Sequence, residues 1–250
     1  MKIQVLIENK SRDEALGCEH GLSLYIEALD RRLLFDTGAS PLFISNADKM
    51  GVDLSEVEFV IISHGHFDHG GGLEAFLQLN DRAEVFVHPL AFGNFFSKQS
   101  NGRLRYIGLD GQLEGRRQLV YTTDRFTITR GIRLFSKVMA QAPLPSSNRD
   151  LMKKVKGRLE DDDFAHEQNL VIEEGDRMTL FSGCAHRGIV NIVEHFHSIK
   201  GRYPDVVIGG FHLAKGDEDR ESDEDIERIA SFLLSTGARY YTGLCTGRIP

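Results

Sequence analysis

One short stretch constrains this chain most: Ser63–Gly72, which reads SHGHFDHGGG and places three histidines and an aspartate within six positions. The apolar, partly β-branched run Phe59–Ile62 comes directly before it. Leu73, Phe76 and Leu77 follow its glycines at helical spacing. This order predicts a buried strand, then a loop, then a helix.

The side chains of this loop indicate a metal site. In an extended segment His64 and His66 project to the same side, and Asp68 and His69 follow just past the bend. Neutral imidazole nitrogens and carboxylate oxygens are ligands that zinc, iron and manganese accept. Isolated histidines are usually surface or satisfied core residues. Four potential ligands at one strand end, beside glycines, are hard to explain in that way.

Other expected strands also end in residues that can bind metal. Cys184 and His186 follow one strand and His212 follows another, while Cys245 follows a fourth strand that has no histidine. Because ligand sites of layered α/β proteins gather at strand ends, we expect these tips and the histidine-rich loop to converge on one point. Asp36, in the turn Asp36-Thr37-Gly38 after a further strand, is a turn former whose carboxylate can accept from nearby backbone N–H groups.

Periodicity predicts the other regular elements. The expected strands are Met1–Glu8, Gly21–Glu27, Arg32–Phe35, Ala83–His88, Gln118–Tyr121, Phe126–Thr129, Ile132–Phe135, Asn169–Glu173, Met178–Phe181, Asp205–Ile208 and Tyr240–Thr242. Helices are expected over Pro41–Met50 and from Ile189 onward. A third should begin at the capping box formed by Ser222 and Asp225.

The middle of the chain is less regular. Pro89 begins a Phe-rich stretch expected to be helical or irregular, and Gln141–Asp150 is expected to be a surface loop. A basic run, Lys153–Arg158, and an acidic run, Glu160–Asp163, follow. The simplest interpretation of these runs is a solvated, mobile segment. The alternative is a lid whose basic residues contact an anionic substrate.

Composition narrows the functional classes. A length of 250 residues with 41% hydrophobic residues suits one domain over residues 1–250. The formal net charge of -7 argues against broad electrostatic binding of nucleic acid or an anionic membrane. No apolar run is long enough to span a membrane, and the first residues alternate as a strand rather than as a signal peptide. Three cysteines suit a reducing, cytoplasmic location.

Two of these motifs together resemble a known family. The HxHxDH pattern of His64–His69 and the upstream Asp36-Thr37-Gly38 turn are similar to motifs of the metallo-β-lactamase superfamily. Three further segments resemble the subgroup related to the archaeal dihydropterin ribofuranosylaminobenzene phosphate synthases. These segments are Glu19–Ser23, Gly183–Asn191 and Gly209–Leu213.

The resemblance spans about Ile3 to Gly247 and implies the α+β class. The implied architecture is a four-layer αββα sandwich, in which two mixed sheets lie face to face with helices outside. It also implies two divalent metal ions along one edge, with zinc as the first choice and iron or manganese as alternatives. By position, His64, His66 and His186 would hold one ion, and Asp68, His69 and His212 the other.

The chain departs from the family pattern at two positions. Many members carry a metal-bridging aspartate at the end of the strand where this chain has Cys184. The subgroup commonly has a histidine where Leu244 precedes Cys245-Thr246-Gly247. Cys184 is either a thiolate ligand or a small buried residue, and Cys245 is expected to be structural.

Other polar residues are expected near the metals. His166 is a possible additional ligand. His20, Asp36 and His88 are expected to contact substrate or to support the ligands from behind.

The expected chemistry follows from a strongly positive site, which favours a bound hydroxide and an anionic substrate group. The first hypothesis is a metal-dependent hydrolase whose metal-bound hydroxide attacks a small anionic ester, with a phosphoester as the first choice. A metal lowers the pKa of its bound water from about 15.7 toward about 7. Asp68 would be both a ligand and a catalytic proton acceptor.

Two alternatives stay open. The resemblance implies a transferase that condenses a pterin with a sugar-phosphate partner and expels diphosphate. Cys184 and Leu244 motivate a non-catalytic metal-binding or ligand-sensing protein. In each case the expected partner is a small molecule, and neither nucleic acid nor a membrane is expected to bind.

Overall fold

Two six-stranded sheets form the centre of the computed structural model. The structure describes residues 1–214 and 220–246. Gly247, the last residue of the family resemblance, lies outside the described residues. The first sheet has the order β1-β2-β3-β4-β5-β8 and the second β16-β15-β14-β13-β10-β9. The first sheet comprises β1 (Lys2–Ile7), β2 (Ser23–Ala28), β3 (Arg31–Phe35), β4 (Phe59–Ile61), β5 (Glu84–Val87) and β8 (Leu119–Tyr121). The second comprises β9 (Arg125–Thr129), β10 (Ile132–Ser136), β13 (Gln168–Glu174), β14 (Arg177–Ser182), β15 (Val206–Gly210) and β16 (Arg239–Gly243).

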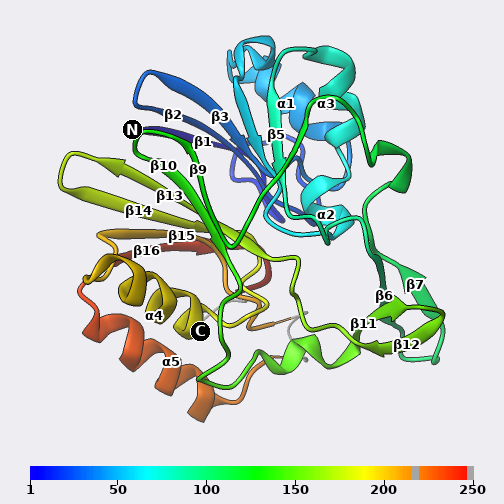
Figure 1. Ribbon diagram of the computed structural model, residues 1–250, viewed down its shortest axis with the longest axis vertical. Helices are drawn as coiled ribbons and strands as arrows, with labels where there is room; N and C mark the ends of the chain where they lie inside the picture. Colours follow the sequence, from blue (N-terminus) through cyan, green and yellow to red (C-terminus); the bar gives the residue numbers. More distant parts are fainter. Residues whose placement is uncertain (215–219, 247–250) are drawn as a thin grey trace.

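Both sheets are mixed, and helices cover their outer faces (Figure 1). In the first sheet β1–β3 are antiparallel and β3, β4, β5 and β8 are parallel. Helices α1 (Leu42–Lys49) and α3 (Leu73–Leu79) lie outside the first sheet, and α4 (Ile189–Lys200) and α5 (Asp223–Ser235) outside the second. The predicted αββα sandwich is therefore confirmed. Short helical turns are α2 (Phe67–Gly70), η1 (Leu54–Glu56), η2 (Gly111–Leu113), η3 (Ser146–Asp150) and η4 (Leu244–Thr246).

Alternating side chains hold the layers together. On β3, Leu33 and Phe35 point between the sheets, while Leu34 packs toward the outer helices. The ring centroids of Phe35 and Phe181 are 5.9 Å apart across the sheet interface. Because both faces are buried, this strand is apolar at successive positions. Each expected strand ends within two residues of an observed one, and Ser222 caps α5 by accepting a hydrogen bond from the Asp225 N–H.

A third, four-stranded sheet was not predicted. Its order is β12-β11-β6-β7, and it comprises β6 (Asn94–Lys98), β7 (Leu104–Tyr106), β11 (Leu151–Val155) and β12 (Arg158–Asp161). The expectation of an irregular stretch after Pro89 is thus wrong, since it contains β6. The charged runs, interpreted above as a solvated, mobile segment, pair as the hairpin of β11 and β12, and the side chains of β12 are exposed to solvent.

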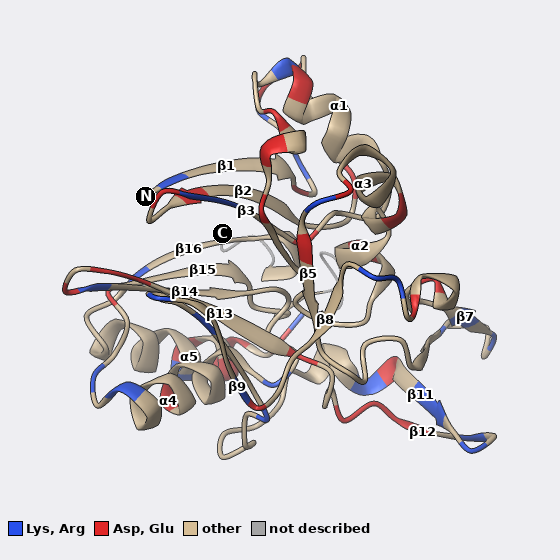
Figure 2. Ribbon diagram, turned by 45° about the horizontal axis from the view of Figure 1, so that its top comes forward, with Lys and Arg blue, Asp and Glu red and all other residues tan. Residues whose placement is uncertain are grey.

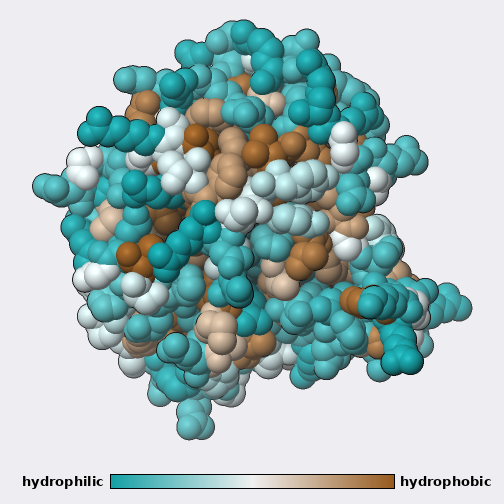
Figure 3. Space-filling model, viewed as in Figure 1, coloured by the Kyte–Doolittle hydropathy of each residue, from teal (hydrophilic) through white to brown (hydrophobic). Residues whose placement is uncertain are grey.

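Charge complementarity and a small core explain this third sheet. Figure 2 shows the basic strand β11 beside the acidic strand β12. Lys153 Nζ lies 2.7 Å from the Asp163 carboxylate. Phe95, Leu151 and Phe164 are buried together beneath the sheet. Its far end projects from the body of the molecule and has a mainly hydrophilic surface (Figure 3).

The chain topology brings several strand ends to one edge. β3 and β4 run parallel in the first sheet, and β14, β15 and β16 run parallel in the second. Their carboxyl ends lead into Asp36, His64, Cys184, His212 and Cys245. Among the described residues no helix is both long and apolar enough to cross a membrane.

Candidate metal centre

A buried carboxylate fixes the histidine-rich loop. Asp36, which has a φ of 60°, is fully buried, and its Oδ1 accepts a hydrogen bond from the Ser63 N–H at 2.7 Å. Its Oδ2 accepts from the Ser63 hydroxyl at 2.8 Å and lies 2.6 Å from His69 Nδ1. Asp36 does not line the cavity described below, so it orients a ligand rather than contacting a substrate.

The first group of converging donors comprises His64, His66 and His186, whose ligand atoms lie within 4.8 Å of one another. The Nε2 atoms of His64 and His186 are 3.3 Å apart. Burial, followed by the neighbouring imidazoles, holds the pKa of both rings well below the usual range, so both are neutral. Two lone pairs aimed at one place in this way fit a bound cation.

The other nitrogen of each of these two rings is held by the protein. His64 Nδ1 lies 2.9 Å from the Ser63 hydroxyl oxygen, and His186 Nδ1 lies 3.0 Å from Asn148 Oδ1. This network assigns the proton to Nδ1 and leaves Nε2 free. Such outer partners fix the tautomer and orientation of metal-binding histidines.

The third sheet supplies a carboxylate behind His66. Asp162 is buried, and its Oδ2 lies 3.1 Å from His166 Nε2 and 3.7 Å from His66 Nε2. The longer distance is an electrostatic contact rather than a hydrogen bond. Burial would raise the pKa of Asp162, but the hydrogen bond with His166 and the nearby His66 imidazole outweigh it and hold that pKa well below its usual value.

His166 holds the histidine-rich loop through hydrogen bonds. Its Nδ1 accepts a hydrogen bond from the Gly65 N–H at 2.9 Å, and its Nε2 is directed at Asp162. Both ring nitrogens of His166 thus have hydrogen-bond partners among the described residues. His166 also forms, with His66 and Asp162, a group of three donors whose ligand atoms lie within 4.8 Å of one another, so its role as an additional ligand stays a prediction.

The second group of donors lies beside the first. His69 Nε2 is 3.5 Å from Asp68 Oδ2 and 3.3 Å from Cys184 Sγ. His212 is buried, and neither of its ring nitrogens has a hydrogen-bond partner among the described residues. The rings of His186 and His212 are 4.2 Å apart, so the two groups adjoin.

Electrostatics at this second group favours positive charge. Burial alone would lower the pKa of His69, but Asp36 and Asp68 raise it to about 9. Burial would raise the pKa of Asp68, but the His69, His20 and His66 imidazoles hold it below its usual value. A site that stabilises a protonated imidazole between carboxylates also suits a metal cation, so the donors of both groups fit divalent ions.

Two thiols complete the cluster. Cys184 Sγ and Cys245 Sγ are 3.1 Å apart, and both residues are buried. Burial and the adjacent Cys245 raise the pKa of the Cys184 thiol. Burial would also raise the pKa of Cys245, but the Cys184 thiol and the imidazoles of His212 and His69 outweigh it and favour the thiolate.

These groups border a cavity of about 550 Å³. Lys10 and Arg105 line it, and the Arg105 guanidinium lies 5.1 Å from the centroid of the Phe67 ring. His20 stands at its mouth, with Nε2 3.4 Å from Asp68 Oδ2 and a side chain that is 61% exposed. His88 lines a separate hollow beside Thr122 and Asp124 and does not border this cavity.

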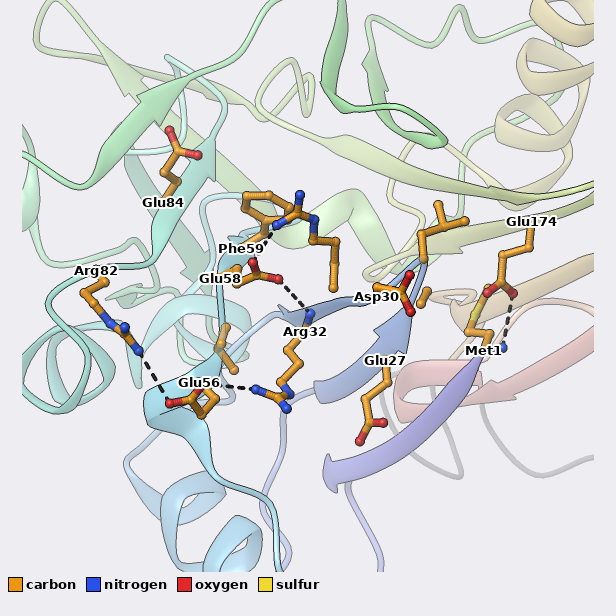
Figure 4. Close-up of a pocket in the computed structure, with 14 residues that line it drawn as sticks. Met1, Glu27, Asp30, Arg32, Glu56, Glu58, Phe59, Arg82, Glu84 and Glu174 are labelled. Carbon is orange, nitrogen blue, oxygen red and sulfur yellow. Dashed lines mark hydrogen bonds and ion pairs between the residues drawn. The ribbon is translucent and has the colours of Figure 1, made fainter.

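A larger hollow of about 870 Å³ lies at the opposite edge, where the parallel strands of the first sheet begin (Figure 4). Its charged residues are largely neutralised by each other. Arg31 Nη1 is 2.7 Å from Glu58 Oε1, and Arg32 Nη1 is 3.0 Å from Glu56 Oε2. With its charges paired and no histidine or cysteine in its lining, this hollow offers no comparable chemistry.

Replacing Asp162 by alanine is expected to weaken zinc binding about 10-fold, because His66 loses the carboxylate that orients it. Asp162→Asn should restore part of the affinity, since an amide oxygen can still accept from His166. The measurement is competition with a chromogenic zinc chelator. Asp161→Ala, in the exposed adjacent position, is the matched control. Equal affinities for all three variants would contradict this role.

The buried carboxyl of Glu167 should make the free energy of unfolding depend on pH. Burial raises its pKa to about 7 from 4.5, despite a hydrogen bond from the Arg187 N–H. As pH rises, the Glu167 carboxyl therefore ionises in the unfolded chain before it ionises in the folded protein. The wild type loses stability between 4.5, the pKa in the unfolded chain, and about 7, the pKa in the folded protein. Glu167→Gln should gain up to about 3 kcal/mol over wild type at pH 8 and little at pH 4.

Urea unfolding in the presence of a chelator measures this difference in unfolding free energy. Glu114→Gln, at an exposed position, is the control and should show no such pH trend. A Glu167→Gln gain that stays the same from pH 4 to pH 8 would show that the carboxyl is not perturbed.

Three residues that hold the histidines in place were not predicted from the sequence. Ser63 adjoins the histidine motif but carried no signal of its own. Asn148 and Asp162 lie in the weakly patterned middle of the chain, at sequence separations of 38 from His186 and 96 from His66. Only their position in the folded chain identifies them.

Comparisons with known proteins agree with this geometry. A sequence model described as the metallo-beta-lactamase superfamily matches residues 16–232. The crystal structure of Tm1679, a metal-dependent hydrolase of the beta-lactamase superfamily, is similar with a TM-score of 0.82 and 31% identity, covering 98% of this chain and 88% of that chain.

Two proteins of Methanocaldococcus jannaschii are also similar. One is 7,8-dihydropterin-6-methyl-4-(beta-D-ribofuranosyl)-aminobenzene-5'-phosphate synthase, with 29% identity over 264 residues, covering 99% of this chain and 86% of that protein. The other is an uncharacterized protein with 27% identity over 259 residues, covering 98% of this chain and 90% of that protein.

Proposed function

Because the chain belongs to the metallo-β-lactamase superfamily, we propose that it is a metal-dependent hydrolase of small anionic esters, with phosphoesters as its substrate class. One observation carries this proposal. The neutral Nε2 atoms of His64 and His186, 3.3 Å apart, lie beside a cavity that also presents Lys10 and Arg105. Within residues 1–214 and 220–246, neither of these two cations forms an ion pair.

Two groups of residues would hold the metal ions. The first group, His64, His66 and His186, would hold one ion, and Asp68, His69 and His212 would hold another. Bound divalent ions, of which zinc suits these donors, supply a water of lowered pKa and positive charge for the oxygen that becomes negative.

Asp68 and His20 can transfer the proton of the nucleophile to solvent. The lowered pKa keeps Asp68 ionised, so its carboxylate can accept a proton from the nucleophile. His20, 3.4 Å away and mostly exposed, can pass that proton to solvent. Asp68 therefore serves as both ligand and proton acceptor in this proposal.

Other residues that line the cavity would bind the substrate. Arg105 and Lys10 would contact its anionic group, and Phe67, Ile107 and Leu151 offer an apolar surface for the rest of the molecule. Because Arg105 lies on β7, the third sheet would take the role that was expected of a lid: it places a basic residue in the lining of the cavity.

Arg105→Ala is expected to raise KM for an anionic ester about 5- to 10-fold, with kcat nearly unchanged, because the lost contact binds substrate and transition state alike. Steady-state kinetics on the best phosphoester measures both constants. Arg103→Ala, two positions earlier, exposed and outside the lining of the cavity, is the control. A fall in kcat at constant KM would contradict this substrate role.

A panel assay tests the main proposal. Purified protein loaded with zinc, manganese or iron is incubated with nitrophenyl phosphomonoesters and phosphodiesters, a lactone and a thioester. Phosphoester turnover that a chelator removes supports the proposal. No turnover of any ester by metal-loaded protein would overturn it.

A second candidate is transfer rather than hydrolysis. The 29% identity with the M. jannaschii synthase, over 99% of this chain, favours it. The same cations would then hold a diphosphate leaving group while a second substrate attacks. Diphosphate release from a pterin diphosphate that requires an aminobenzene sugar-phosphate partner would support transfer, whereas release in its absence would support hydrolysis.

A further inference from the structure

We propose that Cys184 and Cys245 are thiolate ligands of this centre, which makes it a mixed sulfur and nitrogen site selective for thiophilic ions such as Zn²⁺. The inference rests on the metal-dependent part of the proposed function. It revises the expectation that Cys245 is only structural, and it decides between the two roles left open for Cys184.

Cys184 occupies the middle of the donor cluster. Its Sγ lies within 4.8 Å of ligand atoms of His64 and His69, and within the same distance of those of His186 and His212. It is 3% exposed, and it borders the cavity that contains the metal position. A ligand at this place can serve both groups of donors.

Cys245 adds a second sulfur from a different strand. Its Sγ is 3.1 Å from Cys184 Sγ, and it borders the same cavity. Neighbouring Leu244 also borders this cavity but has no donor atom, so Cys245 is the donor that the end of β16 offers. Among the described residues Cys245 is in none of the groups of three donors within 4.8 Å, and it meets the cluster through Cys184 Sγ.

Two glycines let these thiols approach the histidines. A Cβ on Gly183 would lie 2.1 Å from Ser63 Oγ, so a larger residue would push the tip of β14 away from the histidine loop. A Cβ on Gly210 would lie 3.0 Å from the Gly183 carbonyl oxygen and 3.3 Å from Cys245 Sγ. The close approach of β14, β15 and β16 at this point therefore requires small residues.

The donor chemistry distinguishes a ligand pair from a packing pair. Both cysteines lie in the apolar core between the two sheets, where a packing role alone would leave them with apolar neighbours, but Cys184 Sγ also lies 3.3 Å from His69 Nε2. Nearby His212 has two buried ring nitrogens with no hydrogen-bond partner among the described residues. Thiolates and imidazoles together suit zinc, cobalt and ferrous iron, and they discriminate against magnesium and manganese.

Cobalt substitution tests this directly. The chelator-treated protein is titrated with Co²⁺ under anaerobic conditions, and its absorption spectrum is recorded. Thiolate ligation predicts a sulfur-to-cobalt charge-transfer band in the near ultraviolet, in addition to the visible ligand-field bands. Cys184→Ser and Cys245→Ser should each weaken this band, and the double variant should lack it.

Cys18 provides a matched control, because it is the exposed third cysteine and lies outside the cavity. Cys18→Ser should keep the full band. The serine variants should also bind zinc at least about 10-fold more weakly than Cys18→Ser in chelator competition. A band that depends on Cys18 alone would overturn the assignment.

X-ray absorption at the zinc edge of the wild-type protein makes the test independent of how the variants fold. A sulfur shell at about 2.3 Å beside nitrogen and oxygen at about 2.0–2.1 Å would support the proposal. Bound zinc or cobalt without any sulfur signal would overturn the thiolate assignment while leaving metal-dependent hydrolysis intact. No binding of either ion would overturn both.

Discussion

Replacing His64 with alanine is expected to remove tight metal binding and to lower ester turnover by at least about 10³-fold, that is, by about 4 kcal/mol of transition-state stabilisation. The physical reason is its central position. Its Nε2 lies 3.3 Å from that of His186, and its ligand atom belongs both to the first donor group and to the group with His69 and Cys184. Metal content by elemental analysis and turnover of the best ester are the two measurements.

His197→Ala is the matched control for this experiment. His197 also lies against an aromatic ring, with its centroid 4.4 Å from that of Tyr203, but it is on the outer helix α4 and does not border the cavity. This variant should keep its metal and its turnover. Full activity of His64→Ala at full metal content would show that the reaction takes place elsewhere in the molecule.

Asp36→Ala is expected to have the next largest effect, and on two properties at once. It should lower metal affinity about 10- to 100-fold, because His69 loses the carboxylate 2.6 Å from its Nδ1. It should also lower the unfolding free energy by about 3–5 kcal/mol, because the buried partners of this carboxylate are left unpaired. Chelator competition and urea unfolding measure the two effects separately.

Asp30→Ala controls for the backbone part of this change. Asp30 has a φ of 57°, close to the 60° of Asp36, but it is exposed in the turn between β2 and β3. It should therefore reproduce the cost of placing alanine in a left-handed conformation without affecting the metal. If Asp30→Ala and Asp36→Ala destabilise equally, the buried network around Asp36 contributes nothing measurable.

The third sheet and the residue that follows it bear on both substrate contacts and metal binding. Arg105 on β7 lines the cavity, and Asp162, directly after β12, lies 3.7 Å from His66 Nε2. Changes in this segment can therefore alter both substrate contacts and the orientation of a metal ligand. We expect substitutions in this sheet to change KM and metal affinity more readily than overall stability, because its core is small and separate from the core between the two main sheets.

The sequence by itself determined the features that depend on neighbouring residues. Strand periodicity predicted the strands of the two main sheets, and the capping pair Ser222 and Asp225 predicted the start of α5. The loop from His64 to His69 was identifiable because its donors are packed into six positions. Such signals survive in a linear chain, since local period and spacing are read over a few residues.

Only the tertiary structure decided which distant residues complete the centre. Asn148 and Asp162 come from a segment with no clear pattern, and Cys245 meets Cys184 across a sequence separation of 61 residues. In the sequence the charged runs look like any solvated segment. The pairing of β11 with β6, and the burial of Leu151 beneath them, arise only in the folded chain. These contacts arise from how the sheets pack, and packing depends on the whole chain rather than on any window of it.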